Sequence, residues 1–336
     1  MTDTSFAYRM LADSDRPTRP RGCDWVWDGY LARGDITLLT GTWKTGKTTL
    51  LTGLLGALGG GGEFLGRACS VASAVVVSEE SDDHWDDRRA VIPVGPHARL
   101  VSRPFPSRPT PGGWGELLAW VEGMRAEGAL DLLVVDPLGA FLPGRSDSDS
   151  GTLLAFLGPL RQVAARGTAV LVLHHPRRAK SEEGSTARGG GALLGYVDVI
   201  LELHHVVRGR DGNRRRLTAR SRRAEPDDVV YEWAPGTAEF RVVPDDPEAR
   251  FRENWEAVRA LLADRRSAAT HRDLLADWPV EEPAPAAGLL YDWLRRATAA
   301  GLAVRTGKGS KTDPYRFALP RPNSLADLPE LGPLPV

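Results

Sequence analysis

The chain has 336 residues, of which 42% are hydrophobic and 26% charged, and its formal net charge is −1. This length predicts about two domains with a substantial core, and a charge so near zero excludes a protein that binds polyanions through its global charge. Cys23 and Cys69 are too few for a disulfide framework or a zinc site, no apolar run reaches membrane-spanning length, and the N-terminus lacks the basic and apolar regions of a signal peptide, so we expect a cytoplasmic protein without a membrane partner.

The first predicted element of the larger domain is a short buried strand. Residues 1–24 are polar and contain proline and arginine, and we expect them to form a flexible arm. Residues 25–245 follow as the larger domain, in which the apolar run 36–40 predicts a strand. Leucines at helical spacing in residues 50–58 predict a helix soon after it. A glycine-rich segment, residues 41–48, connects the two.

This segment matches the spacing G-x-x-x-x-G-K-[ST] of a phosphate-binding loop. Gly41 and Gly46 let successive backbone N–H groups and the positive end of the helix face one anion. Lys47 adds a charge for the β- and γ-phosphates, and Thr48 offers a hydroxyl to magnesium. A chance match is the alternative, and the flanking strand and helix make it less frequent. The predicted cofactor-binding residues are Gly41, Thr42, Trp43, Lys44, Thr45, Gly46, Lys47, Thr48 and Thr49.

Two acidic residues follow the next predicted strand, residues 74–78. In open α/β sheets, ligands bind at the carboxyl ends of the strands, and Glu79 and Glu80 come at such an end. A carboxylate at that edge can orient and deprotonate the water that attacks a γ-phosphate. A solvated turn is the alternative. The position one crossover after a phosphate loop favours the catalytic interpretation.

Two further strands end in polar side chains. Residues 130–136 form an apolar run that ends in Asp136, whose carboxylate we expect to hold magnesium or a magnesium-bound water. Residues 169–173 form another, followed by His174, which can donate to the γ-phosphate and report its hydrolysis. A strand-end histidine bonded to backbone is the alternative for His174. Together these elements predict an α/β fold with a mostly parallel central sheet.

A long loop rich in arginine, serine and glycine comes next, at residues 176–191. Loops of this length in a compact domain are usually functional or mobile. Arg177, Arg178 and Arg188 make a phosphate backbone the expected partner, and a solvated loop is the alternative. Predicted strands at 197–203 and 214–222 and a hairpin at 229–243 complete the domain.

The order of these motifs resembles that of the RecA-like ATPases. The phosphate loop is followed by Ser-Glu-Glu-Ser, Leu-Leu-Val-Val-Asp, Leu-Val-Leu-His-His-Pro, a Gly/Arg loop and a strand with Arg-x-Arg. Within that group the chain is most similar to the RepA-type branch, which comprises hexameric helicases and related ATPases of plasmids, phages and integrated elements. Trp-Lys-Thr-Gly-Lys-Thr-Thr resembles the loop of that branch. The resemblance covers about residues 25–243.

This resemblance implies roles for individual residues. Lys47 and Thr48 would bind ATP and Mg²⁺, Asp136 would support the metal, and His174 would take the sensor position. Glu79 would be the base, with Glu80 beside it as the second acid of the pair. Arg220 and Arg222 match a Lys-x-Arg element that relatives insert into the neighbouring subunit's site, with arginine in place of the usual lysine at position 220. A basic exposed strand is the alternative for that pair.

Such an arginine finger, supplied by a neighbour, neutralises charge only as it develops in the transition state. Hydrolysis would therefore require assembly, and the resemblance implies a homo-oligomer, such as a hexameric ring, or a filament.

Residues 250–320 differ in character from the preceding domain. Three predicted helices and two strands resemble a winged helix, which binds duplex DNA through its third helix and its wing. Winged helices also dock proteins, so this alternative stays open. Residues 321–336 form a tail without a predicted structure. The cations expected on the DNA-binding elements are Arg295, Arg296, Lys308 and Lys311.

The sequence therefore predicts a magnesium-dependent ATPase coupled to DNA, as in a replicative helicase-like motor of a mobile element or phage. Single-stranded DNA would bind the ATPase ring and duplex DNA the winged helix. The competing hypothesis is a nucleotide-gated DNA-binding or helicase-loading switch that does not translocate.

Overall fold

A computed structural model provides the structure of the chain. The description covers residues 23–128, 130–142, 150–175, 191–206, 213–245, 247–265, 267–279, 284–285, 287–310 and 312–320.

Within these residues, nine strands form one large sheet in the order β13-β12-β11-β10-β3-β9-β8-β6-β7. The strands from β10 to β7 run parallel to one another, whereas β11, β12 and β13 are added antiparallel at one side. The predicted α/β fold with a mostly parallel sheet is confirmed. The strands are β3 (Ile36–Thr40), β6 (Ala74–Ser78), β7 (Ala98–Ser102), β8 (Leu132–Asp136), β9 (Ala169–His174), β10 (Val199–His205), β11 (Arg214–Ser221), β12 (Val229–Trp233) and β13 (Phe240–Val242).

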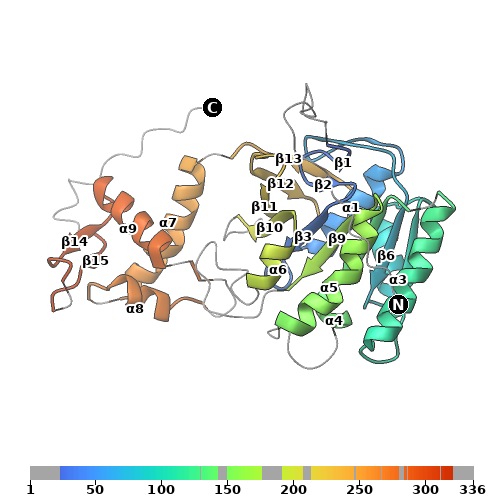
Figure 1. The fold of residues 1–336 in the computed structure, drawn as a ribbon. Helices are drawn as coiled ribbons and strands as arrows, with labels where there is room; N and C mark the ends of the chain where they lie inside the picture. Colours follow the sequence, from blue (N-terminus) through green and yellow to red (C-terminus); the bar gives the residue numbers. More distant parts are fainter. Residues whose placement is uncertain are drawn as a thin grey trace, which may run out of the picture.

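Helices cover both faces of this sheet, because its parallel strands alternate apolar side chains between two cores (Figure 1). Val76 of β6, for example, belongs to the core beneath α1, while Val75 and Val77 pack against α3, α4 and α5. The helices of this domain are α1 (Lys47–Leu58), α2 (Asp82–Val91), α3 (Pro111–Ala126), α4 (Leu138–Phe141), α5 (Ser150–Ala165) and α6 (Gly191–Tyr196).

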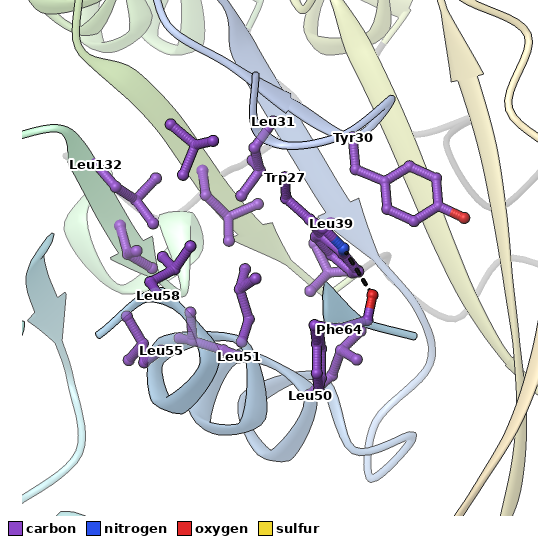
Figure 2. Packing of buried hydrophobic residues seen from close by; sticks show 14 of the residues in the cluster. Trp27, Tyr30, Leu31, Leu39, Leu50, Leu51, Leu55, Leu58, Phe64 and Leu132 are labelled. Carbon is purple, nitrogen blue, oxygen red and sulfur yellow. Dashed lines mark hydrogen bonds between the residues drawn. The ribbon is translucent and has the colours of Figure 1, made fainter. Parts of the chain in front are cut away.

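A second, four-stranded sheet packs beside α1, in the order β2-β1-β5-β4. Figure 2 shows Leu50, Leu51, Leu55 and Leu58 of α1 gathered with Trp27, whose indole donates to the Phe64 carbonyl over 3.1 Å. This burial fixes α1, and with it the loop that precedes α1, against the large sheet. The strands are β1 (Trp25–Trp27), β2 (Leu31–Ala32), β4 (Gly62–Phe64) and β5 (Arg67–Cys69).

Two predicted strands begin later than their apolar runs, because in each an aspartate side chain binds a distant partner just before the backbone pairing of the strand starts. Strand β8 was predicted from residue 130, but the Asp131 carboxylate accepts hydrogen bonds from Arg33 and from the Ser73 backbone N–H. Strand β10 was predicted from residue 197, but the Asp198 carboxylate accepts from the Ile36 N–H over 2.9 Å. Both aspartates instead tie neighbouring strands together at their starting ends.

The C-terminal residues form a separate hydrophobic cluster. Thr270 and Asp273 form a capping box at the start of the second helix. Ala269 and Phe317 pair antiparallel, which joins the segment before that helix to the last strand. The elements are α7 (Pro247–Ala263), α8 (His271–Ala276), α9 (Ala287–Ala299), β14 (Val304–Thr306) and β15 (Arg316–Ala318).

No helix in the described part of the chain combines the length and the apolar character that crossing a membrane requires.

Candidate functional site

The predicted phosphate loop connects β3 to α1 at the carboxyl edge of the large sheet. It passes so close to β10 that a Cβ on Gly41 would lie 2.5 Å from the Leu203 carbonyl oxygen. Gly46, immediately before α1, has φ of 90°, in the left-handed region that favours glycine. Both glycines of the motif are therefore required by backbone geometry.

Lys47 is buried at the first position of α1. Its ammonium donates to the carbonyl oxygens of Gly41 and Thr42 over 2.8 and 3.0 Å, so the lysine side chain lies across the loop. Burial lowers the pKa of Lys47 to about 8, although the charge of Asp136 acts in the opposite direction. An anion in the loop would favour the protonated lysine.

Thr48 and Asp136 meet beside this lysine. The Thr48 hydroxyl donates to Asp136 Oδ2 over 3.0 Å. Burial raises the pKa of Asp136 to about 7, with smaller raising effects from Glu80 and Glu79 and a lowering effect from the Thr48 hydrogen bond. Ionised Asp136 would be stabilised by a nearby cation. A hydroxyl oxygen and a carboxylate oxygen are also ligands that suit Mg²⁺.

The remaining acids of the motif lie on the neighbouring strand. Ser78 of β6 pairs with Asp136 of β8, and the Glu79 N–H donates to the Asp136 carbonyl over 3.1 Å. The carboxylate of Glu80 is held by both terminal nitrogens of Arg88, one of them at 2.7 Å. The Glu79 side chain is exposed and, within the described residues, forms no ion pair. The pKa of Glu79 is raised by partial desolvation and by Glu80.

His174 reaches the same edge on β9, the strand between β3 and β8. It ends β9, where it pairs in register with Thr40, the last residue before the loop. The adjacent His175 has its pKa lowered to about 4, by desolvation and by the charges of Lys47 and His174. His175 is thus neutral at physiological pH and feels the charge of the loop lysine, a relationship that the sequence alone does not reveal.

Lys47, Thr48, Asp136, Glu79 and His174 are thus gathered around one edge of the sheet. A protein-family model for the AAA domain matches residues 2–181, which contain all of them. The chain belongs to the AAA domain family. A search of curated proteins gave no significant match.

Membership of this family of P-loop ATPases indicates nucleotide hydrolysis by the AAA domain. The family match ends at residue 181, whereas the large sheet of the AAA domain continues through β10, β11, β12 and β13. Two of these strands, β10 and β11, supply contacts to the loop that the motif does not contain.

One such contact comes from Arg215 near the start of β11. Its Nε donates to the Thr45 carbonyl over 2.7 Å, although 170 residues separate the two. His205, at the end of β10, pairs with Arg215 and lies close enough to the loop to bond the Lys44 backbone. Desolvation and the charge of Arg215 lower the pKa of His205 to about 4. Sequence reasoning missed both residues. The available signal was the short separation between the predicted strands 197–203 and 214–222, which favours antiparallel pairing of the two.

The other loop residues differ in their exposure. Trp43 is 70% exposed, and the Lys44 ammonium lies 4.2 Å from the centre of its ring. Thr45 is buried, and its hydroxyl donates to the Thr42 carbonyl over 2.9 Å. Thr49 is partly buried in the first turn of α1.

Arg220 and Arg222 lie away from this site. Arg220 pairs with Ile200, and the Arg222 N–H donates to the Asp198 carbonyl, so both arginines are near the starting ends of β10 and β3. The Arg222 guanidinium also donates to the Gly195 carbonyl over 2.9 Å. The structure does not bring the two arginines to the phosphate loop of their own AAA domain.

The predicted DNA-binding cations are only partly described. Arg177, Arg178, Arg188 and Lys311 lie outside the described residues.

The cations that are described lie in the C-terminal part of the chain. Arg295 of α9 is exposed and pairs with Asp292 over 3.6 Å. Arg296 pairs with Glu248, and its guanidinium stacks 4.1 Å from the Phe251 ring centre, so Arg296 holds α9 against α7. Lys308 is exposed in the turn between β14 and β15.

Proposed function

We propose that this AAA domain hydrolyses ATP with Mg²⁺ at the carboxyl edge of the large sheet. The observation that carries the proposal is the 3.0 Å contact between Thr48 and Asp136 beside the buried Lys47. It joins the phosphate loop to the acid at the end of β8, which are the two halves of a nucleoside triphosphatase site. The backbone N–H groups of the loop and Lys47 would bind the phosphates, with Lys47 exchanging loop carbonyls for phosphate oxygens.

Thr48 and Asp136 would hold the magnesium ion. Among the described residues, no group of three or more histidines, cysteines or acids could hold a metal by itself. The phosphates of the nucleotide would therefore complete its coordination, as is usual for magnesium. The ion would supply charge neutralisation at the β- and γ-phosphates.

Glu79 is the proposed base for the attacking water. Its carboxylate is exposed at the edge, and its raised pKa makes it a better proton acceptor than an ordinary glutamate. Glu80 is held by Arg88, so its proposed part is to fix the segment that follows β6. His174, beside the loop, would sense the γ-phosphate.

We assign Arg220 and Arg222 to the site of a neighbouring subunit. Arg222 is 61% exposed, although it contacts Asp198 and Gly195. A second copy of the chain could therefore receive it. This arrangement makes a homo-oligomer, such as the hexamer of the RepA-type helicases that the sequence resembles, the active form.

The C-terminal elements support a winged helix. Their order is α7, α8, α9, β14 and β15, and an isolated bridge between Ala269 and Phe317 holds the segment before α8 beside the two-stranded β14–β15 sheet. Three helices followed by two paired strands fit a winged helix, in which α9 would enter the major groove. Arg295 and Lys308 would contact phosphates there.

The function that we propose is a cytoplasmic, RecA-like motor of a plasmid, phage or integrated element, with single-stranded DNA bound by the ATPase ring and duplex DNA by the winged helix. A nucleotide-gated DNA-binding or helicase-loading switch is the second candidate, since Arg222 is tethered within its own chain. The test is ATP turnover with and without single-stranded DNA, combined with light scattering and a strand-separation assay. DNA-stimulated turnover with strand separation supports a motor. Slow turnover with ATP-dependent DNA binding supports a switch, and no turnover at any chain concentration refutes both.

A further inference from the structure

Three consecutive arginines begin β11, and they have different partners. Arg214 pairs with Glu232 of β12 over 2.5 Å, and Arg216 pairs with Asp245 over 2.6 Å and Asp228 over 3.3 Å. Arg215, whose side chain points to the opposite face of the strand, donates to the Thr45 carbonyl of the phosphate loop. One position in this basic run is therefore directed at the nucleotide site.

The Arg215 contact determines the orientation of one peptide group. In a trans peptide the C=O of residue 45 and the N–H of residue 46 point in opposite directions. Because Arg215 holds the Thr45 oxygen on the β11 side, the Gly46 N–H points away from β11. Without that contact, the peptide before a glycine with φ of 90° can rotate at low cost and turn a carbonyl oxygen toward a bound anion.

The environment of Arg215 indicates that its charge also matters. The side chain is half-buried, and desolvation lowers its pKa, with the nearby Tyr231 acting in the opposite direction. Burying a guanidinium costs free energy unless its donors are satisfied. The Thr45 carbonyl accepts from Nε and the Arg214 carbonyl accepts from Nη1 over 2.9 Å, which leaves the cation at the rim of the phosphate loop.

We propose that Arg215 is a positioning residue of the nucleotide site, which holds the Thr45–Gly46 peptide so that the loop binds the polyphosphate group. This inference rests on the proposed binding of ATP at the loop and extends it to a strand beyond the family match. Arg215 would affect binding of the polyphosphate group, which nucleoside triphosphates share with inorganic tripolyphosphate. The base and ribose take no part in it.

The test compares Arg215→Met and Arg215→Lys with the control Arg214→Met, all in the full-length chain. The control removes the same charge one residue away, on the other face of β11. Dissociation constants for ATP and for tripolyphosphate are measured by calorimetry with Mg²⁺. Arg215→Met should weaken both ligands about tenfold by equal factors, because methionine has no donor for the Thr45 carbonyl, and Arg215→Lys should recover affinity to within about threefold, because an ammonium can donate to it. Arg214→Met should bind like the wild type.

Hydrogen exchange of a loop peptide covering residues 41–50, measured without ligand, is the second readout. Exchange should rise in Arg215→Met and stay unchanged in Arg214→Met, whether or not the variant binds nucleotide. Wild-type affinity in Arg215→Met, or an unchanged exchange rate of the loop, overturns the role of Arg215 and leaves the ATPase proposal intact. A wild-type chain that binds neither ATP nor tripolyphosphate overturns both.

Discussion

The Thr48 hydroxyl donates to Asp136 Oδ2 over 3.0 Å, although 88 residues separate the two along the chain. This contact joins the first turn of α1 to the end of β8, next to the buried ammonium of Lys47. Burial raises the pKa of the Asp136 carboxyl to about 7, so its ionisation destabilises the folded protein. The consequence can be measured directly.

Asp136→Asn should stabilise the ligand-free protein at pH 8. The folded-state pKa of Asp136 lies above the unfolded value of 3.8, so its contribution to stability is fully present below about pH 3.8 and is lost as pH rises through about 7. Asparagine keeps an acceptor for Thr48 without the charge. The free energy of unfolding of the variant relative to wild type, followed through Tm, should rise between pH 4 and 7 by up to roughly 4 kcal/mol and stay constant above pH 7. A Tm difference that does not change with pH would contradict the burial argument.

Lys47→Ala should weaken ATP binding at least about 100-fold, or roughly 2.7 kcal/mol, because the phosphates lose a full charge. The wild-type affinity should also fall as pH rises above about 8, where Lys47 loses its proton in the free protein. Lys47→Arg stays charged, so any affinity that it retains should be level from pH 7 to about 9.5. Calorimetric titrations at several pH values check both, and undiminished binding by Lys47→Ala would refute the loop assignment.

Glu79→Gln should leave ATP bound and lower kcat by about 10² to 10⁴, because the attacking water loses its base. The matched control is Glu80→Gln. It breaks the charged contact with Arg88, so we expect a lower Tm with a smaller loss of kcat. Single-turnover hydrolysis distinguishes them. If Glu80→Gln is the variant that binds without cleaving, then Glu80 is the base.

Arg222→Ala should lower kcat about 10³-fold with ATP affinity largely retained. Arg222 is 61% exposed, so its loss should change Tm little. Mixing Arg222→Ala with Glu79→Gln subunits should restore part of the activity, since a hybrid interface contains one intact Glu79 and one intact Arg222. No recovery over a range of mixing ratios would count against a finger supplied by a neighbour.

Charge reversal at Arg295 and Lys308 should weaken binding to duplex DNA. Two lost phosphate contacts should reduce the slope of log K against log salt by about 2. Arg259→Glu, an exposed change on α7, should leave the slope unchanged. Fluorescence anisotropy between about 50 and 200 mM salt gives the slope. An unchanged slope in the double variant would favour protein docking by this part of the chain.

Much of the fold follows from local patterns. The bounds of β3 and β6 were predicted to the residue, because each is a buried apolar run with a turn at both ends. The starts of β8 and β10 were not, because Asp131 and Asp198 act through partners distant in the sequence. The phosphate loop was predictable since its spacing is a local requirement of the backbone.

The parts of the site that depend on tertiary register were not predictable. Glu79 and Glu80 are equivalent in the sequence, and only the position of Arg88 in α2 distinguishes them. Arg215 is one of three adjacent arginines, and the pairing of β11 with β10 decides which of them faces the loop. Such choices depend on which face of a strand a side chain occupies, and a shift of one residue would reverse them.

Strand β11 also limits what one molecule can do by itself. At ~3.4 Å per residue, the seven steps from Arg215 to Arg222 span ~24 Å, several times the reach of an arginine side chain. The molecule that supplies Arg215 to a loop therefore cannot supply Arg222 to that loop. Dilution should consequently slow turnover per chain, and activity plotted against total concentration should curve upward before it becomes linear.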